Sequence, residues 1–104
     1  MLGDLEQIVL LAVLRIGGEA YGVVIADEVR RTAGRDLTLA TIYKTLGRLE
    51  EKGLVRASLG DPTPVRGGRA KRYYAVTASG LSVLRESVDV LRRMLRGVDL
   101  KAGA

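Results

Sequence analysis

The strongest constraint on this chain is a seam of apolar residues in its last quarter. Six of them recur at alternating spacings of three and four: Leu81, Leu84, Val88, Leu91, Leu95 and Val98. This a/d pattern is typical of a helix that packs along another helix. We expect the helix to begin after Thr77, a favourable N-cap, and to run to about Val98. At about 1.5 Å per residue, such a helix is about 30 Å long.

A helix of that length is longer than the rest of a 104-residue chain can cover. The seam therefore predicts a projecting helix that pairs with a second copy of the chain. Packing on the N-terminal helix of the same chain is the alternative interpretation.

The second apolar segment lies near the N-terminus. Residues 5–16 are predicted to form a helix with Asp4 as its N-cap, and apolar side chains cover nearly its whole circumference. A helix that is apolar on all sides is buried on more than one side, so we expect Leu5, Ile8 and Leu11 to contribute to a subunit contact. A central core helix in a monomer is the alternative.

The composition excludes several classes of protein. The chain has no cysteine and no histidine, which excludes disulfides, thiolate or imidazole catalysis, and metal sites built from these ligands. The longest apolar run, residues 8–14, is far shorter than the roughly 20 residues of a membrane-spanning helix, and no signal-peptide pattern precedes it. We therefore expect a cytoplasmic protein with no metal, no cofactor, no membrane partner and no enzymatic activity.

Positive charge is concentrated in the second half of the chain. Residues 1–53 carry seven basic and eight acidic side chains, whereas residues 54–104 carry ten and four. The net charges of the two halves are therefore −1 and +6. A basic half of this kind favours a polyanionic partner, of which nucleic acid is the commonest. An anionic membrane surface and a merely solvated face are the alternatives.

The third predicted helix carries the most informative pattern. A short amphipathic helix is expected over about residues 21–33. The third helix is expected to begin after the N-cap Thr38 and to run to Lys52. Its packing face comprises Leu39, Ile42, Leu46 and Leu49. A second face carries no acid and comprises Thr41, Lys44, Thr45, Arg48 and Lys52. We interpret the second face as a DNA-contacting surface, with a solvated face as the alternative.

Gly47 lies inside this helix, where glycine costs about 1 kcal/mol relative to alanine. We therefore expect a close approach of backbone or of a neighbouring helix at this position.

From Leu54 onward the pattern changes to that of a β-hairpin. Residues 54–60 and 70–76 read as two short strands, and the segment between them contains two prolines and several glycines. No acid occurs among residues 62–76, whereas four cations lie in and beside the tip: Arg66, Arg69, Lys71 and Arg72. The hairpin is therefore predicted to contact phosphates, with a solvated turn as the alternative. Within the second strand we expect Tyr74 to face the core.

Three helices, a basic hairpin and a long helix are the element order of a winged helix-turn-helix. The predicted fold is mainly α with a small β-hairpin (α+β). Residues 1–77 would form the DNA-binding domain, and residues 78–104 would form the dimerisation helix and a short tail. The base-reading or base-bordering candidates are Thr38, Thr41, Lys44, Thr45 and Arg48. The phosphate-contacting candidates are Tyr21, Lys52, Arg66, Arg69, Lys71 and Arg72.

Three segments resemble the PadR family of bacterial transcriptional regulators: EAYGVVIADEV, ATIYKTLGRLEEKGLV and GGRAKRYYAVTASG. The resemblance covers about residues 5–96 and implies a homodimeric repressor. The single C-terminal helix is similar to that of the compact subgroup, in which this helix packs against helix one of the partner. The resemblance places Tyr43, Lys44 and Arg48 on the recognition helix, Tyr21 and Gly22 at the start of helix two, and Arg69, Lys71 and Arg72 in the wing.

The resemblance also implies a small-molecule effector. Family members that bind aromatic compounds use aromatic side chains, and this chain has no Trp and no Phe. The hypothesis is a dimer that places two recognition helices on double-stranded DNA, on an inverted repeat with half-site centres about 34 Å apart. An effector would act by changing the angle between the projecting helices.

Two alternative functions remain at this point. A small dimeric protein-interaction module without specific DNA binding would tolerate Lys44→Glu and Arg69→Glu, whereas a repressor would lose operator binding. An enzyme would need a converging pair of acids, but Glu50 and Glu51 are adjacent and diverge on a helix.

Overall fold

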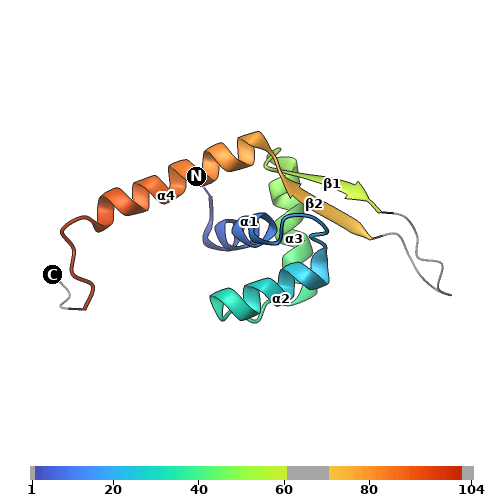
Figure 1. Ribbon diagram of the computed structural model, residues 1–104, viewed down its shortest axis with the longest axis horizontal. Coiled ribbons are helices and arrows are strands. Elements are labelled where there is room, and N and C mark those ends of the chain that lie inside the picture. Colours follow the sequence, from blue (N-terminus) through green and yellow to red (C-terminus); the bar gives the residue numbers. More distant parts are fainter. Residues whose placement is uncertain (1, 61–70, 102–104) are drawn as a thin grey trace.

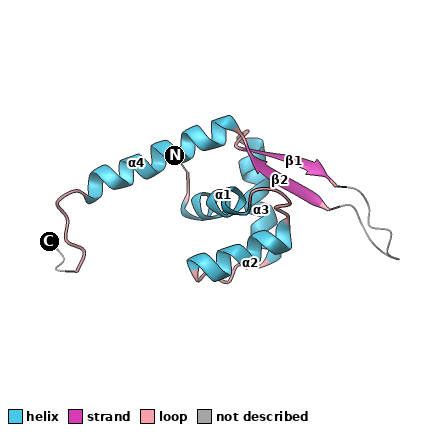
Figure 2. Cartoon of the chain, in the orientation of Figure 1, coloured by secondary structure: helices cyan, strands magenta, loops and turns pink. Residues whose placement is uncertain are grey.

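The computed structural model describes residues 2–60 and 71–101, in which helices predominate (Figures 1 and 2). The helices are α1 (Asp4–Ile16), α2 (Gly22–Ala33), α3 (Leu39–Glu51) and α4 (Ala78–Leu95). The strands are β1 (Val55–Leu59) and β2 (Arg72–Val76). The α+β winged helix-turn-helix fold with a long C-terminal helix is therefore confirmed.

The three N-terminal helices form the body of the molecule (Figure 1). The hairpin extends from one side of this body, and α4 extends from the opposite side. No helix in the described ranges combines the length and the apolar character needed to cross a membrane.

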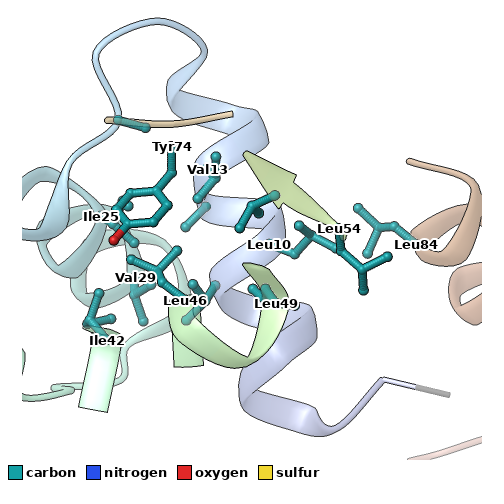
Figure 3. Packing of buried hydrophobic residues seen from close by; sticks show 14 of the residues in the cluster. Leu10, Val13, Ile25, Val29, Ile42, Leu46, Leu49, Leu54, Tyr74 and Leu84 are labelled. Carbon is teal, nitrogen blue, oxygen red and sulfur yellow. The ribbon is translucent and has the colours of Figure 1, made fainter. Parts of the chain in front are cut away.

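The core lies where α1, α2 and α3 meet. Leu10, Ile25 and Leu46 are fully buried there, one from each helix (Figure 3). Tyr74 of β2 covers the core and is 6% exposed, which confirms its predicted inward orientation. Leu84 of α4 also belongs to this core (Figure 3). The same apolar cluster thus holds the helical body, the hairpin and the start of α4 together.

The two strands pair antiparallel, with Val55 opposite Val76 and Leu59 opposite Arg72. The amide of Tyr74 donates to the carbonyl of Ala20 at 2.8 Å, so the hairpin is also bonded to the segment between α1 and α2. These bonds fix the base of the wing against the helical body. The expected tip residues Arg66 and Arg69 lie outside the residues that the structure describes.

The predicted caps of α3 and α4 are confirmed, whereas that of α1 is wrong. The Thr38 hydroxyl accepts from the Thr41 amide at 3.1 Å, and the Thr77 hydroxyl accepts from the Gly80 amide at 3.0 Å. Gly3, not Asp4, is the N-cap of α1. Its amide donates to the Glu6 carboxylate at 2.9 Å, because Glu6 occupies the third helical position and reaches back to the cap.

The C-terminal helix is shorter than predicted. It ends at Leu95, and Gly97 follows with φ +74°, a left-handed conformation that glycine adopts at little cost. Val98 therefore lies beyond the helix, and its assignment to a helical seam is wrong.

Packing of α4 also differs from the prediction at its N-terminal end. Leu84 is 5% exposed in the core of its own chain, so it is not available to a partner. The alternative interpretation, packing on the same chain, holds for this part of the helix. Leu91 and Leu95, farther along, are about half exposed.

Candidate nucleic-acid interface

The outward face of α3 is rotated relative to the face predicted from the sequence. The exposed residues of α3 are Leu39, Ala40, Tyr43, Lys44 and Arg48, with Glu50 and Glu51 in the last turn. Thr45 is 2% exposed, and its hydroxyl donates to the carbonyl of Thr41 at 2.8 Å. The prediction that Thr45 faces outward is therefore wrong. A β-branched side chain whose hydroxyl is satisfied by the preceding turn packs well in a core.

Thr38 and Thr41 border this face at the N-terminal end of α3. Thr38 is exposed and Thr41 is half-buried. Their hydroxyls are hydrogen bonded to each other at 3.0 Å. Both side chains are thus held close to the start of the helix, which is the part of a recognition helix that contacts base edges.

Lys52, at the end of α3, has an acidic partner within the chain. Its ammonium nitrogen lies 2.6 Å from the Glu6 carboxylate of α1. Glu6 is buried, and the hydrogen bonds from Lys52 and from the Gly3 amide lower the pKa of this carboxyl below its ordinary value. The ion pair ties the C-terminal end of α3 to the N-terminal end of α1. Sequence reasoning missed it because the two residues are 46 positions apart.

Arg72, at the start of β2, is also paired internally. One guanidinium nitrogen donates to both carboxylate oxygens of Glu50, at 3.0 and 3.1 Å, and another donates to the Tyr74 hydroxyl at 3.1 Å. The Glu50 carboxylate raises the pKa of Arg72. These bonds connect the base of the wing to the last turn of α3, and they reduce the positive charge that Arg72 presents to the outside.

The base of the wing contacts the start of α2 through Tyr21. The Lys71 ammonium nitrogen lies 4.4 Å from the centroid of the Tyr21 ring and 3.4 Å from its hydroxyl. The Tyr73 ring meets the Tyr21 ring edge-on, with 5.8 Å between the centroids. Tyr21 is the N-cap of α2, and no acid occurs in the first turn of this helix. The helix start and Lys71 together form a positively polarised surface.

The start of α2 also contacts α3, through Gly22 and Tyr43. A Cβ atom built on Gly22 would lie 2.2 Å from the Tyr43 hydroxyl oxygen, so only glycine leaves room for this ring. Sequence reasoning placed both residues near DNA but missed their contact. The signal available was a glycine at the first position of a helix, where most residues have a higher helix propensity.

Gly47 differs from Gly22. A Cβ atom built there meets nothing within 4 Å. The predicted close approach of a neighbouring helix is therefore wrong for the described chain, and this position of α3 faces open space.

The contacts join several predicted site residues into one continuous surface. Lys71 touches Tyr21, Gly22 follows Tyr21 directly, and Tyr43 lies against Gly22. Lys44 follows Tyr43 on the outward face of α3. The base of the wing, the start of α2 and the exposed face of α3 are thus adjacent, and we call this combined surface the reading surface.

A separate apolar surface lies between α1 and α4. A groove of about 310 Å³ is lined by the apolar residues Leu11, Leu14, Leu81, Leu84 and Val88 and by the charged residues Arg85, Asp89 and Arg92. Leu11 and Leu14 are 39% and 44% exposed. Leu5 and Ile8, also predicted to face a partner, are only half-buried.

Comparison with known proteins identifies relatives over most of the chain. Residues 10–86 match the family described as the transcriptional regulator PadR-like family. A relative from Lysinibacillus sphaericus, named uncharacterized protein X, is 30% identical over 100 residues, which are 94% of this chain and 87% of that protein.

Two solved structures are similar in fold. A PadR family transcription regulator from Clostridium difficile is 25% identical with a TM-score of 0.74, over 88% of this chain and 91% of that one. Bacillus subtilis PadR in complex with operator DNA is 22% identical with a TM-score of 0.68, over 82% of this chain and 46% of that one.

Proposed function

The chain belongs to the PadR-like family of transcriptional regulators, and from this membership we propose that it is a homodimeric repressor that binds an inverted-repeat operator in the cytoplasm. The observation that supports this proposal most is the continuity of the reading surface. Lys71, just before β2, contacts Tyr21, the N-cap of α2. Tyr43 of α3 lies against Gly22, the next residue of the chain. The Bacillus subtilis relative of similar fold is described in complex with operator DNA.

In the proposed complex α3 enters the major groove. Lys44 and Arg48 are exposed and supply charged donors, and Thr38 and Thr41 border the base edges at the start of the helix. Tyr21 and Lys71 contact the phosphates beside the groove, together with Arg66 and Arg69 of the tip. Lys52 and Arg72 are paired with Glu6 and Glu50, so they offer phosphates less net positive charge than Lys44 or Lys71.

We assign dimerisation to residues 78–104 and DNA binding to residues 1–77. The exposed side chains of Leu91 and Leu95 continue the apolar surface that begins in the groove between α1 and α4. A second copy of α4 would bury this surface and the exposed Leu11 and Leu14 of α1. Burying half-exposed leucines contributes about 25 cal/mol per Å² of apolar area.

A dimer determines the spacing of the two reading surfaces. With half-site centres about 34 Å apart, both copies of α3 enter the DNA from the same side. A small-molecule effector would release the operator if it binds more tightly to a dimer whose two reading surfaces have a different spacing. Only such a difference in affinity shifts the equilibrium between the two forms of the dimer.

Selection of bound sequences from a random DNA pool tests this function. The selection is performed at two salt concentrations, because nonspecific phosphate contacts lose affinity as salt rises. Enrichment of two inverted half-sites at both concentrations is the expected result. Binding without enrichment and with a steep salt dependence would contradict the proposal and leave a nonspecific DNA-binding protein. Absence of DNA binding would favour a dimeric protein-interaction module.

A further inference from the structure

Part of the reading surface is apolar rather than cationic. Leu39 is 44% exposed and Tyr43 is 45% exposed on α3, with Ala40 also exposed between them. Val23, the residue after Gly22, is 57% exposed on α2. The sequence pattern assigned Leu39 to the packing face of the helix. In the structure its side chain lies at the edge of the outward face, on the side opposite Lys44 and Arg48.

Val23 and Leu39 line the same surface groove. It has a volume of about 430 Å³, and its other apolar lining residues are Val24, Ala26 and Leu37. Asp27 and Arg30 also line it. Asp27 is paired with Arg30 and Arg31, so the acid at this groove is neutralised within α2. The groove therefore offers an apolar surface without a strong negative charge against a polyanion.

We propose that Leu39 and Val23 contact the C5-methyl group of a thymine in each operator half-site and so contribute to sequence specificity. The thymine methyl is the one apolar group that base pairs present in the major groove. Leu39 is the first residue of α3, at the end of the helix that reads base edges in complexes of this type. Lys44 and Arg48 on the other side of α3 supply the charge that brings the apolar edge against DNA.

This inference rests on the proposed function and is tested with the selected operator. Each thymine of one half-site is replaced in turn by deoxyuridine, which removes only the methyl group. The native protein should bind at least one such site roughly fourfold more weakly, as expected for loss of one buried methyl group. In Leu39→Ala or Val23→Ala the same replacement should have a smaller effect, because the methyl group has lost one of its two contacts. In the double variant it should have almost none. The two changes should thus be non-additive.

Leu100→Ala is the matched control, because Leu100 is 76% exposed and lies outside the reading surface. Circular dichroism and urea unfolding check that each variant folds, and alanine at the first turn of a helix is a favourable residue. If Kd is unchanged for every deoxyuridine site, or if Leu39→Ala and Val23→Ala keep the full response to the methyl group, the inference is wrong while the repressor function stands. If the pool yields no operator, both are wrong.

Discussion

At the scale of single residues, the carboxylate of Glu6 is the buried charge on which the helical body depends. Among the residues that the structure describes, it is the one buried acid, and it accepts hydrogen bonds from Lys52 and the Gly3 amide. Replacing it by Gln removes the negative charge of the acceptor in both bonds. We expect Glu6→Gln to lower the free energy of unfolding at pH 7 by about 1 to 2 kcal/mol, since Lys52 is partly solvated. Urea unfolding measures this change.

The same residue gives the stability a defined pH dependence. The folded-state pKa of Glu6 is lowered from its ordinary value of 4.5. Its contribution is therefore fully present above pH 4.5 and is lost as the pH falls through the lower folded-state pKa. The difference in stability between the native protein and Glu6→Gln should shrink over that acidic range. A difference that stays constant down to pH 2 would contradict the assigned ion pair.

Gly47 provides a separate test of the outward face of α3. A side chain at this position meets no atom of the described chain, so Gly47→Ala should raise the free energy of unfolding by about 0.5 to 1 kcal/mol through helix propensity. Thermal or urea unfolding measures this gain. A loss of stability would show that the position is packed. Operator binding by the stabilised variant then reports how closely DNA approaches this part of the helix.

At the scale of elements, the contact between Gly22 and Tyr43 sets how α2 lies against α3. In Gly22→Ala the new Cβ displaces the Tyr43 ring, which is half exposed and can turn outward. We expect a change in unfolding free energy of about 1 kcal/mol or less, because the ring escapes the overlap. Operator affinity should fall about tenfold, because the reading surface loses its arrangement.

A double-mutant cycle with Tyr43→Ala separates this effect from a general loss of stability. Once Tyr43 is removed, Gly22→Ala should have little further effect on Kd. Additive losses would mean that the two residues act independently and that Gly22 does not position α3.

The features of these elements that were predicted correctly depend on short-range patterns in the sequence. The threonine caps of α3 and α4, the change of period at Leu54 and the inward Tyr74 all depend on residues close in the chain. The pairs Glu6 with Lys52 and Arg72 with Glu50 join residues 46 and 22 positions apart, so no local pattern reveals them. Thr45 was misplaced because a helical face drawn from the sequence has an uncertain boundary, and a threonine is compatible with either side of it.

At the scale of the whole molecule, the exposed leucines of α4 predict the assembly state. Leu91→Glu places a charge in the proposed interface, and because Leu91 is 50% exposed in the chain, the fold should be retained. Sedimentation equilibrium should show a monomer for Leu91→Glu and a dimer for the native protein. Leu100→Glu is the control and should remain a dimer. A dimeric Leu91→Glu would exclude this part of α4 from the interface.

The most direct test of the whole account measures operator affinity for three charge reversals as salt is varied. Lys44→Glu removes a cation of α3, Lys71→Glu removes one at the base of the wing, and Lys101→Glu alters an exposed residue of the tail. We predict that the first two weaken binding about tenfold or more, that Lys71→Glu reduces the salt slope by at least about 1, and that Lys101→Glu changes neither quantity. Native affinity in both Lys44→Glu and Lys71→Glu would contradict the claim that α3 and the wing bind the same DNA.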